Sequence, residues 1–359
     1  MNSLYQNSLQ IILRHQTKEG AFIACPNFKT YQYAWFRDGS FCAHALARAG
    51  YTQNAFQFHQ WASQTVLRYK IKFTECIKEA RSGNHPIPAL CFHSRFTLDG
   101  FEVPGNWGHH QLDGLGTWLW ALGEFQRINP GLVLPDHLKQ AAGLVKDYLS
   151  ALWFFPCSDC WEENETKLHT YTLAAVFAGL ESYAIWQKND DAKIVAEEIR
   201  SFILCNCVSN GAFVKSIGDV AVDSNLIGLF APYHLVDWAN PIYQKTLERI
   251  LKELATPVGL HRYRNDTYYG GGEWVLLTAW MGWAYAQAGE SQLANTILEW
   301  TEAQASPEGE LSEQIPHALF DEAGYKLWKR KWGAIASPLL WSHAKYILLA
   351  KAIDEGCGA

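Results

Sequence analysis

The sequence predicts an all-α protein in which twelve helices pair as six helical hairpins and close into an (α/α)6 barrel. Apolar residues recur at the three- and four-residue spacing of helices along the whole chain, whereas the two-residue alternation of strands is nearly absent. The segments between the expected helices also alternate between short and long. If the hairpins form a ring, all six long segments lie at one rim. An open α-solenoid is the alternative, but the residues show no repeat of constant period.

Each expected helix is a run with apolar residues on at least one face, bounded by turn residues. In chain order they span 3–16, 38–50, 52–70, 112–127, 136–153, 168–187, 190–204, 221–231, 240–255, 273–288, 291–304 and 336–353. The clearest start is Asn240-Pro241, an N-cap residue followed by proline at the first helical position. Leu247, Ile250 and Leu254 then form one apolar stripe.

Composition sets the class of protein and excludes several partners. The chain has 359 residues, of which 48% are hydrophobic, and we expect one domain over 1–359 with a large core. A net charge of −6 gives no electrostatic basis for binding nucleic acid or an anionic membrane. No apolar run reaches the roughly 20 residues of a membrane span. The start of the chain shows no secretory signal, and the nine cysteines are an odd, scattered set, so we expect a cytoplasmic protein with reduced thiols. The oligomeric state is left open.

The chemically interesting residues lie in or beside the long segments, where function is expected on a rigid helical scaffold. These segments span 17–37, 71–111, 154–167, 205–220, 256–272 and 305–335. They bring carboxylates, arginines, tryptophans and tyrosines to the same rim. Such a mixture suits a neutral polyhydroxylated ligand, because charged side chains can bracket hydroxyls while aromatic rings form walls. The 16 tryptophans of the chain also favour a sugar ligand.

Two carboxylic acids from different long segments, Glu162 and Glu313, are the minimum equipment for cleaving a glycosidic bond. One acid would protonate the leaving oxygen and the other would activate water. The alternative is that each is a solvated loop residue or a helix cap. Against that alternative, Trp161 and the pair Leu311-Ser312 are poor choices for exposed loop surface.

Four cysteines in two pairs raise the possibility of a zinc site. Cys157 and Cys160 have metal-binding spacing, but Cys205 and Cys207 are separated by one residue, which is poor chelate spacing. We therefore expect ordinary buried thiols, with no metal and no cofactor.

Seven ordered motifs resemble those of glycoside hydrolase family 15, the glucoamylase family of (α/α)6-barrel enzymes. The resemblance runs from about Gly20 to Lys351. The residues that carry it are Gly20-Ala21-Phe22-Ile23-Ala24-Cys25-Pro26, Trp35-x-Arg37-Asp38, Trp107-Gly108-x-x-Gln111-x-Asp113-Gly114, Trp161-Glu162-Glu163, Arg262-Tyr263-x-x-Asp266-Thr267-Tyr268-Tyr269-x-Gly271-x-x-Trp274, Ser312-Glu313-Gln314 and Leu340-Trp341-Ser342-His343-Ala344.

The resemblance implies that Glu162 is the general acid and Glu313 the general base. It places Arg37 and Asp38 on the hydroxyls of the terminal glucose and has Glu163 and Arg262 line the next subsite. The other expected substrate-binding residues are Trp35, Trp107, Gln111, Asp113, Trp161, Tyr263, Glu273 and Trp274. A water-poor aromatic corner favours the neutral form that an acid needs. Glu163 then requires a cationic partner, for which Arg262 is the candidate.

The expected function is that of an inverting, exo-acting α-glucosidase that releases β-glucose from the non-reducing end of a small oligosaccharide. The segment Gly271-Gly272-Glu273-Trp274 is similar to short bacterial members that act on α-1,6 linkages, so we expect isomaltose-type substrates. The long segment 71–111, with His93, Arg95, Asp99 and Glu102, is expected to wall off outer subsites. The alternatives are a glucoamylase acting on α-1,4 maltooligosaccharides and a catalytically silent glucoamylase-like regulatory or binding domain.

Overall fold

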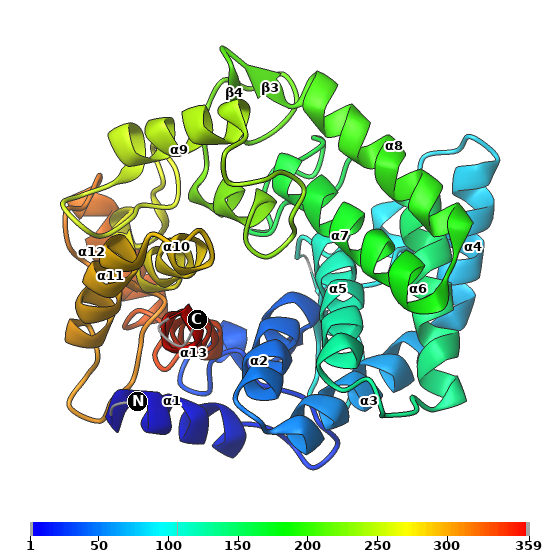
Figure 1. Cartoon of the computed structure of the whole chain (residues 1–359), viewed down its shortest axis with the longest axis horizontal. Coiled ribbons are helices and arrows are strands. Elements are labelled where there is room, and N and C mark those ends of the chain that lie inside the picture. Colours follow the sequence, from blue (N-terminus) through cyan, green and yellow to red (C-terminus); the bar gives the residue numbers. More distant parts are fainter. Residues whose placement is uncertain (1–2, 106, 357–359) are drawn as a thin grey trace.

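An inner ring of six helical elements surrounds the axis of the molecule (Figure 1). The structure is a computed structural model that describes residues 3–105 and 107–356. Each inner element contacts the next, and the last contacts the first, which closes the barrel. In order, they are α2 (Phe36–Arg48), α5 (Asp113–Ile128), α7 (Thr170–Gln187), the 3-10 helix η3 (Ser224–Leu229), α10 (Val275–Gln287) and α13 (Leu340–Gly356).

A second layer of helices packs around this ring and completes the predicted (α/α)6 barrel. It consists of α1 (Ser3–Arg14), α3 (Thr52–Arg68), α6 (Asp136–Leu152), α8 (Asp190–Asn206), α9 (Pro241–Leu254) and α11 (Ser291–Ala303). The hydropathy of each helix agrees with its place in the inner or the outer layer. The inner helices α7 and α10 are apolar on nearly every side, as helices buried in a core must be, whereas α9 has one buried stripe and an exposed polar face. No helix in the described ranges is long and apolar enough to cross a bilayer.

The helix expected over 221–231 is wrong in type and length. The structure forms only the six-residue 3-10 helix η3, capped by the side chain of Asp223, which accepts from the backbone N–H of Asn225 at 2.9 Å. Pro232 is the third residue after the end of η3, and a proline disfavours the helical conformation in the residue before it. The barrel therefore has one short inner element where a full helix was expected.

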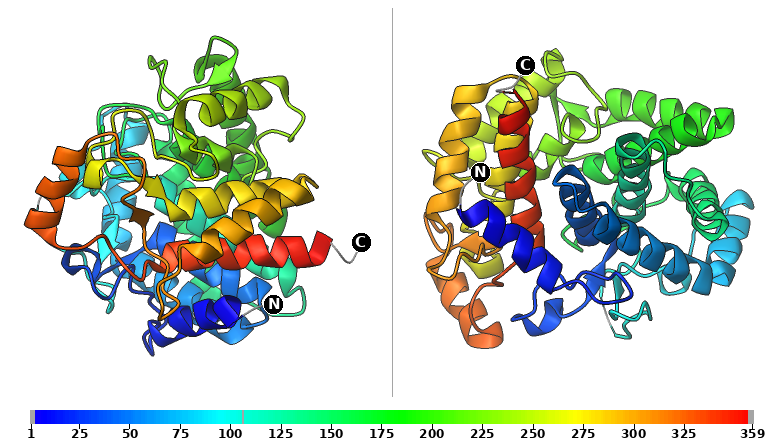
Figure 2. Two further views of the ribbon diagram at one scale, coloured as in Figure 1. Left: turned by 90° about the vertical axis from the view of Figure 1, so that its left-hand side faces the viewer. Right: turned by 60° about the horizontal axis from the view of Figure 1, so that its bottom comes forward.

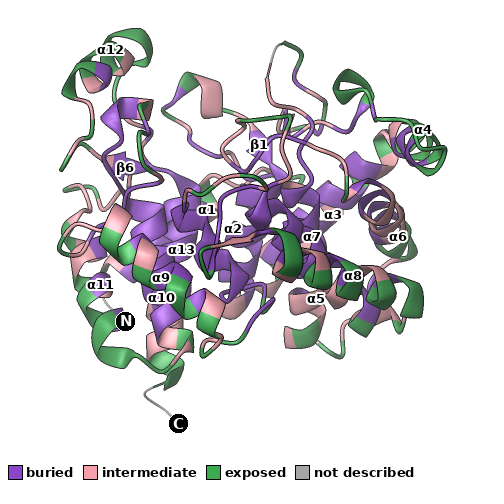
Figure 3. Cartoon of the chain, turned by 90° about the horizontal axis from the view of Figure 1, so that it is seen from above, coloured by how far each residue is buried: buried purple, intermediate pink, exposed green. Residues whose placement is uncertain are grey.

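Two further helices lie inside segments that were expected to be loops. They are α4 (Lys70–Arg81) in the segment 71–111 and α12 (Glu322–Trp332) in the segment 305–335. Phe73, Ile77 and Ala80 form a narrow buried stripe on α4. The many charged residues between them hide this stripe in the sequence. α12 buries almost nothing and projects from the rim (Figures 2 and 3).

Short antiparallel strand pairs join the long segments at the rim, at the opposite end of the molecule from the C-terminal end of α13 (Figures 2 and 3). β1 (Ala34–Trp35) pairs with β2 (Arg95–Phe96), and β5 (Glu273–Trp274) pairs with β6 (Gln314–Ile315). Both pairs tie together segments that are distant in sequence. A third pair, β3 (Val208–Ser209) with β4 (Ala212–Phe213), forms a hairpin in the segment 205–220. The 3-10 helices η1 (Lys29–Tyr31), η2 (Pro88–Leu90) and η4 (Tyr268–Gly270) also lie in the long segments.

A fully buried lysine, Lys345 on α13, lies among aromatic rings inside the barrel. Its Nζ is 3.3 Å from the centre of the Trp280 ring and 3.4 Å from that of Phe41. It has no hydrogen-bond partner among the described residues. Burial holds the pKa of Lys345 well below its usual value, because a charged amine without polar partners is costly in this environment.

We expect Lys345→Met to stabilise the protein by about 1–3 kcal/mol at neutral pH, since it replaces an unsatisfied buried amine with an apolar chain of similar length. The unfolded lysine binds a proton that the folded side chain does not, so the wild type loses stability as pH falls below about 10.4. The gain in the variant should therefore be larger at pH 7 than at pH 9. Denaturant unfolding at both pH values measures it, and a destabilised variant at pH 7 would contradict the prediction.

Candidate active site

A cavity of about 570 Å³ opens at the rim where the long segments meet. Every long segment except 205–220 contributes to its lining, as does the start of α13. Most of the predicted site residues come together here. Those lining the cavity are Trp35, Arg37, Asp38, Trp107, Trp161, Glu162, Glu163, Arg262, Tyr263, Trp274 and Glu313.

Two predicted sugar-binding residues, Gln111 and Asp113, lie behind Arg37 instead of on the cavity wall. Arg37 Nη1 donates to Gln111 Oε1 at 3.2 Å and to Asp113 Oδ2 at 3.1 Å. Asp113 is fully buried in the first turn of α5. Both residues therefore orient the guanidinium group, and the cavity receives Arg37 itself.

The predicted contact of Glu273 with the sugar does not match its position, because Glu273 faces away from the cavity. In a strand, successive side chains point to opposite faces, so β5 directs Trp274 into the cavity and Glu273 behind it. The Glu273 carboxylate is 2% exposed and lies 3.0 Å from His317 Nδ1. A Cβ atom on Gly259 would be 2.5 Å from the Glu273 Cδ atom, so the glycine makes room for this side chain.

The outer wall of the cavity differs from the expected one. His93, Arg95, Asp99 and Glu102 do not line the cavity, and Arg95 approaches it only by stacking 3.9 Å from the centre of the Trp107 ring. The helix α12 contributes Trp328, Lys331 and Trp332 to the wall instead. The sequence analysis did not predict this helix, so it could not predict the contribution of α12 to the cavity wall.

Glu162 is held in an unusual backbone conformation against the cavity. Its φ is 67°, in the left-handed region that side chains other than glycine seldom adopt. Trp35 Nε1 donates to Glu162 Oε1 at 2.7 Å, and Arg37 Nη2 lies 3.6 Å from the same oxygen. Gly108 packs behind the turn, where a Cβ atom would lie 2.9 Å from the Glu162 carbonyl oxygen. Burial raises the pKa of Glu162, while Arg37 and the Trp35 N–H oppose that rise.

Asp159 shapes the turn that carries Glu162. Its Oδ1 accepts hydrogen bonds from the backbone N–H groups of Trp161 at 3.0 Å and Glu163 at 2.9 Å. Its backbone carbonyl accepts from the Glu162 N–H, also at 2.9 Å. One aspartate therefore fixes three consecutive residues of the Trp161-Glu162-Glu163 motif.

Glu313 approaches the cavity from another long segment, just before β6. Its Oε1 accepts from Tyr31 Oη at 3.2 Å, and Tyr31 Oη lies 3.0 Å from Tyr268 Oη. Its Oε2 has no hydrogen-bond partner among the described residues. Burial raises the pKa of Glu313 to about 8, although Arg262 and Tyr31 favour the ionised form. Burial thus raises the pKa of both glutamates that face the cavity.

Arg37 and Asp38 occupy the first turn of α2, at the inner end of the cavity. Arg37 Nε lies 3.5 Å from Asp38 Oδ2, and neither atom has a hydrogen-bond partner among the described residues. Burial raises the pKa of Asp38 to about 6, although the neighbouring Arg37 opposes this rise. Trp341 lies beneath the guanidinium, with its ring centre 5.1 Å from Arg37 Cζ.

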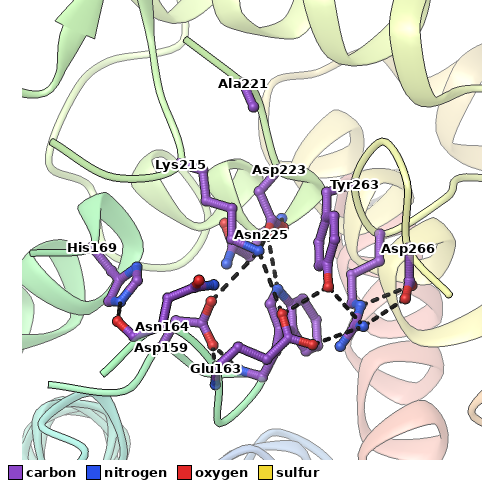
Figure 4. A network of polar contacts seen from close by, with 12 residues as sticks. Asp159, Glu163, Asn164, His169, Lys215, Ala221, Asp223, Asn225, Tyr263 and Asp266 are labelled. Atoms are coloured by element: carbon purple, nitrogen blue, oxygen red, sulfur yellow. Dashed lines mark hydrogen bonds and ion pairs between the residues drawn. The ribbon is translucent and has the colours of Figure 1, made fainter. Parts of the chain in front are cut away.

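The cationic partner predicted for Glu163 is confirmed as Arg262. Arg262 Nη2 donates to Glu163 Oε1 at 3.2 Å, and Tyr263 Oη donates to Glu163 Oε2 at 2.7 Å (Figure 4). Asp266 holds the same arginine through two hydrogen bonds, Nε to Oδ2 at 2.9 Å and Nη2 to Oδ1 at 2.6 Å. The Asp266 carboxylate also caps the Tyr268 N–H at 2.9 Å.

Several residues that contact the predicted site residues were missed or given no role in the sequence analysis. Tyr31 and Lys215 belong to no recognised motif, and only their contacts in the folded protein draw attention to them. Asp159 lies three residues before Glu162, but its role depends on the shape of the turn. Tyr268 and Trp341 lie within quoted motifs, so the resemblance provided a signal for them.

The thiols give no indication of a zinc site. Cys157 and Cys160 are buried, and burial raises the pKa of Cys157 to about 12, whereas Cys205 is exposed. No group of three or more potential metal ligands occurs among residues 3–105 and 107–356. The chemistry that the described side chains offer is proton transfer by two carboxyl groups, Glu162 and Glu313, beside hydrogen-bonding groups and aromatic walls.

Comparison with known proteins identifies relatives over nearly the full chain. An isomaltose glucohydrolase from Kribbella flavida is 35% identical over 357 residues, which cover 98% of this chain and 92% of that protein. A solved structure of a glycosidase variant in complex with glucose has a TM-score of 0.94 at 35% identity, covering 98% of this chain and 96% of the other. The glucoamylase from Saccharomycopsis fibuligera shares the fold, with a TM-score of 0.77 at 15% identity, covering 99% and 95% of the two chains.

The family profile for glycosyl hydrolases family 15 matches residues 1–307. This match and the full-length relative agree with the closed double ring of helices and with the acidic cavity at its rim. The chain belongs to glycosyl hydrolases family 15 and is a glycoside hydrolase.

Proposed function

We propose that the protein is an inverting, exo-acting α-glucosidase that releases β-glucose from the non-reducing end of short α-glucosides, with α-1,6-linked isomaltose preferred to α-1,4-linked maltose. The observation that carries this proposal is the cavity, where the carboxyl groups of the half-buried Glu162 and the buried Glu313, from separate segments, meet a set of unpaired polar atoms. The name of the Kribbella relative supports the choice of isomaltose.

The unpaired atoms suit a ligand rich in hydroxyl groups. Buried polar atoms normally have hydrogen-bond partners, and sugar hydroxyls can both donate and accept. Cavity residues with a buried polar atom that lacks a partner among the described residues are Arg37, Asp38, Trp107, Trp274, Glu313 and Trp341. They include both donors and acceptors, which favours a neutral polyol over a ligand of one charge.

Exo action follows from the closed inner end of the cavity. Arg37 and Asp38 would bind the terminal glucose, and Trp341 stacks on Phe41 beneath them with ring centres 5.8 Å apart. Side chains fill the barrel below this level, so a sugar chain could not continue past the first unit. The leaving part of the substrate would extend outwards past Glu163 and Arg262.

In the proposed reaction, Glu162 donates its proton to the glycosidic oxygen while Glu313 takes a proton from water. The bond from the anomeric carbon to the leaving sugar breaks as a bond to the water oxygen forms on the opposite face, which inverts the configuration. The unpaired Glu313 Oε2 is the atom available to the water. The Trp35 N–H and Arg37 stabilise the Glu162 carboxylate that proton donation leaves behind.

Short substrates fit an outer wall made by α12, whose Trp328 and Trp332 line the outer part of the cavity.

The competing assignment is a glucoamylase acting on α-1,4 maltooligosaccharides. A catalytically silent domain is disfavoured, because it would have no need for two glutamates that face one cavity. We also propose a cytoplasmic location, which the odd, scattered set of nine cysteines supports.

The stereochemistry of the product tests the proposed mechanism. Direct attack by water should release β-glucose first, and this anomer should convert to the equilibrium mixture only later. Anomer-resolved NMR during the first turnovers on isomaltose measures the product directly. Initial formation of α-glucose would overturn the inverting mechanism.

Glu162→Gln and Glu313→Gln should each lower kcat on isomaltose by about 10²–10⁴-fold, because each removes one proton transfer but preserves side-chain shape. Both variants should keep the unfolding transition of the wild type, which separates lost chemistry from lost folding. A Glu313→Gln variant that keeps more than about a tenth of the wild-type rate would show that another group is the base.

Linkage and chain length are tested by kcat/KM on isomaltose, maltose and soluble starch. Isomaltose should exceed both, and Trp332→Ala should narrow the gap between isomaltose and starch by opening the outer wall. Val133→Ala changes an exposed apolar residue remote from the cavity and serves as the control. If maltose or starch exceeded isomaltose by more than about tenfold, the proposal on linkage or on size, respectively, would fail.

A further inference from the structure

Lys215 is a buried lysine from the one long segment, 205–220, that does not line the cavity. It follows the β3–β4 hairpin, and its backbone is fixed on both sides. Its N–H donates to the Ala221 carbonyl at 2.8 Å, and its carbonyl accepts from the Thr170 N–H at 3.1 Å. These two hydrogen bonds hold the backbone from which the Lys215 side chain extends towards Asp159, Glu163 and Asp223 (Figure 4).

Three carboxylates surround the Lys215 ammonium group. Its Nζ is 3.1 Å from Asp223 Oδ2, 3.5 Å from Asp159 Oδ2 and 3.9 Å from Glu163 Oε2. It also lies 3.5 Å from the centre of the Tyr263 ring. Burial alone would lower the pKa of Lys215, but the three carboxylates outweigh burial and raise it, so the lysine remains charged.

Two of these carboxylates hold Trp161, the neighbour of Glu162, from two sides. Asp159 Oδ1 accepts from the Trp161 backbone N–H at 3.0 Å, and Asp223 Oδ2 accepts from Trp161 Nε1 at 2.9 Å. Within the described chain, Asp159 Oδ2 has no hydrogen-bond donor, and Lys215 is the cation that faces it. Without that cation, Asp159 and Asp223 would be two like charges buried close together, and they would separate or change protonation.

We propose that Lys215 is a positioning residue for acid catalysis, which clamps Asp159 and Asp223 around Trp161 and so keeps Glu162 aimed at the glycosidic oxygen. This inference rests on the proposed function, because it takes Glu162 to be the general acid. The left-handed conformation of Glu162 makes the clamp necessary, since an unsupported turn would relax away from φ = 67°.

The test compares two substrates that differ in their need for an acid. Isomaltose requires a proton on its leaving oxygen, whereas α-glucosyl fluoride loses fluoride without one. Lys215→Met should lower kcat on isomaltose by about 10–100-fold, as expected for a misplaced catalytic group. On α-glucosyl fluoride, it should lower kcat by less than about threefold. Lys215→Arg keeps the charge and should recover most of the isomaltose activity.

Control variants separate this clamp from general stabilisation. Lys167→Met removes a more exposed lysine that pairs with Asp219 at 3.4 Å, and it should leave both rates near those of the wild type. If Lys215→Met does not fold, Asp223→Asn provides the second test, because it keeps the shape of one clamp residue but removes its charge. It should show the same selective loss on isomaltose.

If Lys215→Met lowers kcat equally on both substrates, Lys215 has only a structural role and the inference is overturned. The same holds for Asp223→Asn if that variant replaces Lys215→Met in the test. Unchanged activity on isomaltose would also overturn the inference. Glu162→Gln distinguishes this failure from failure of the proposed function. If Glu162→Gln shows the selective loss and the clamp variants do not, only the inference fails. If Glu162→Gln shows no selectivity, the assignment of the acid fails and the inference falls with it.

Discussion

The cavity wall depends on the sharing of each buried cation among several carboxylates. Arg37 lies between Asp113, Asp38 and Glu162, and Arg262 lies between Asp266 and Glu163. An acidic cavity of this kind would be unstable without such sharing, because buried like charges repel in a medium of low polarity. The same ion pairs also fix the orientation of the side chains that form them. Each cation takes its position from a carboxylate behind the wall and in turn orients a carboxylate that faces the cavity.

The sequence allows much of this site to be predicted, because its motifs are local and begin or end barrel helices. Arg37 and Asp38 lie in the first turn of α2. Their position at the rim of the barrel could therefore be predicted from the ring of helical hairpins. The function of Tyr31 could not be predicted, since it depends on the meeting of two segments that are 282 positions apart in the chain. The direction of Glu273 was equally hidden. A strand of two residues is too short to show alternation in a sequence.

Elements that depend on packing were also beyond the sequence analysis. The replacement of an expected helix by η3 follows from Asp223 capping and the nearby Pro232, whereas the apolar pattern of this stretch resembles that of a helix. α12 has few buried residues, so it lacks the stripe by which the other helices were recognised. The periodicity of apolar residues indicates which helices bury one face against a core. It gives little information about helices, such as α12, that lie at the rim of the barrel and bury few residues.

The way α12 is attached has a consequence for how substrate range can change within this architecture. Its main support is η4, where the backbone N–H groups of Phe320 and Asp321 both donate to the Gly270 carbonyl. Tyr269 Oη donates to carbonyl groups just beyond the end of the helix. Within the part of the chain that the structure describes, α12 packs mainly on η4 and not on an inner helix. Insertion, deletion or exchange in α12 would thus change the outer wall of the cavity at little cost to the packing of the two rings.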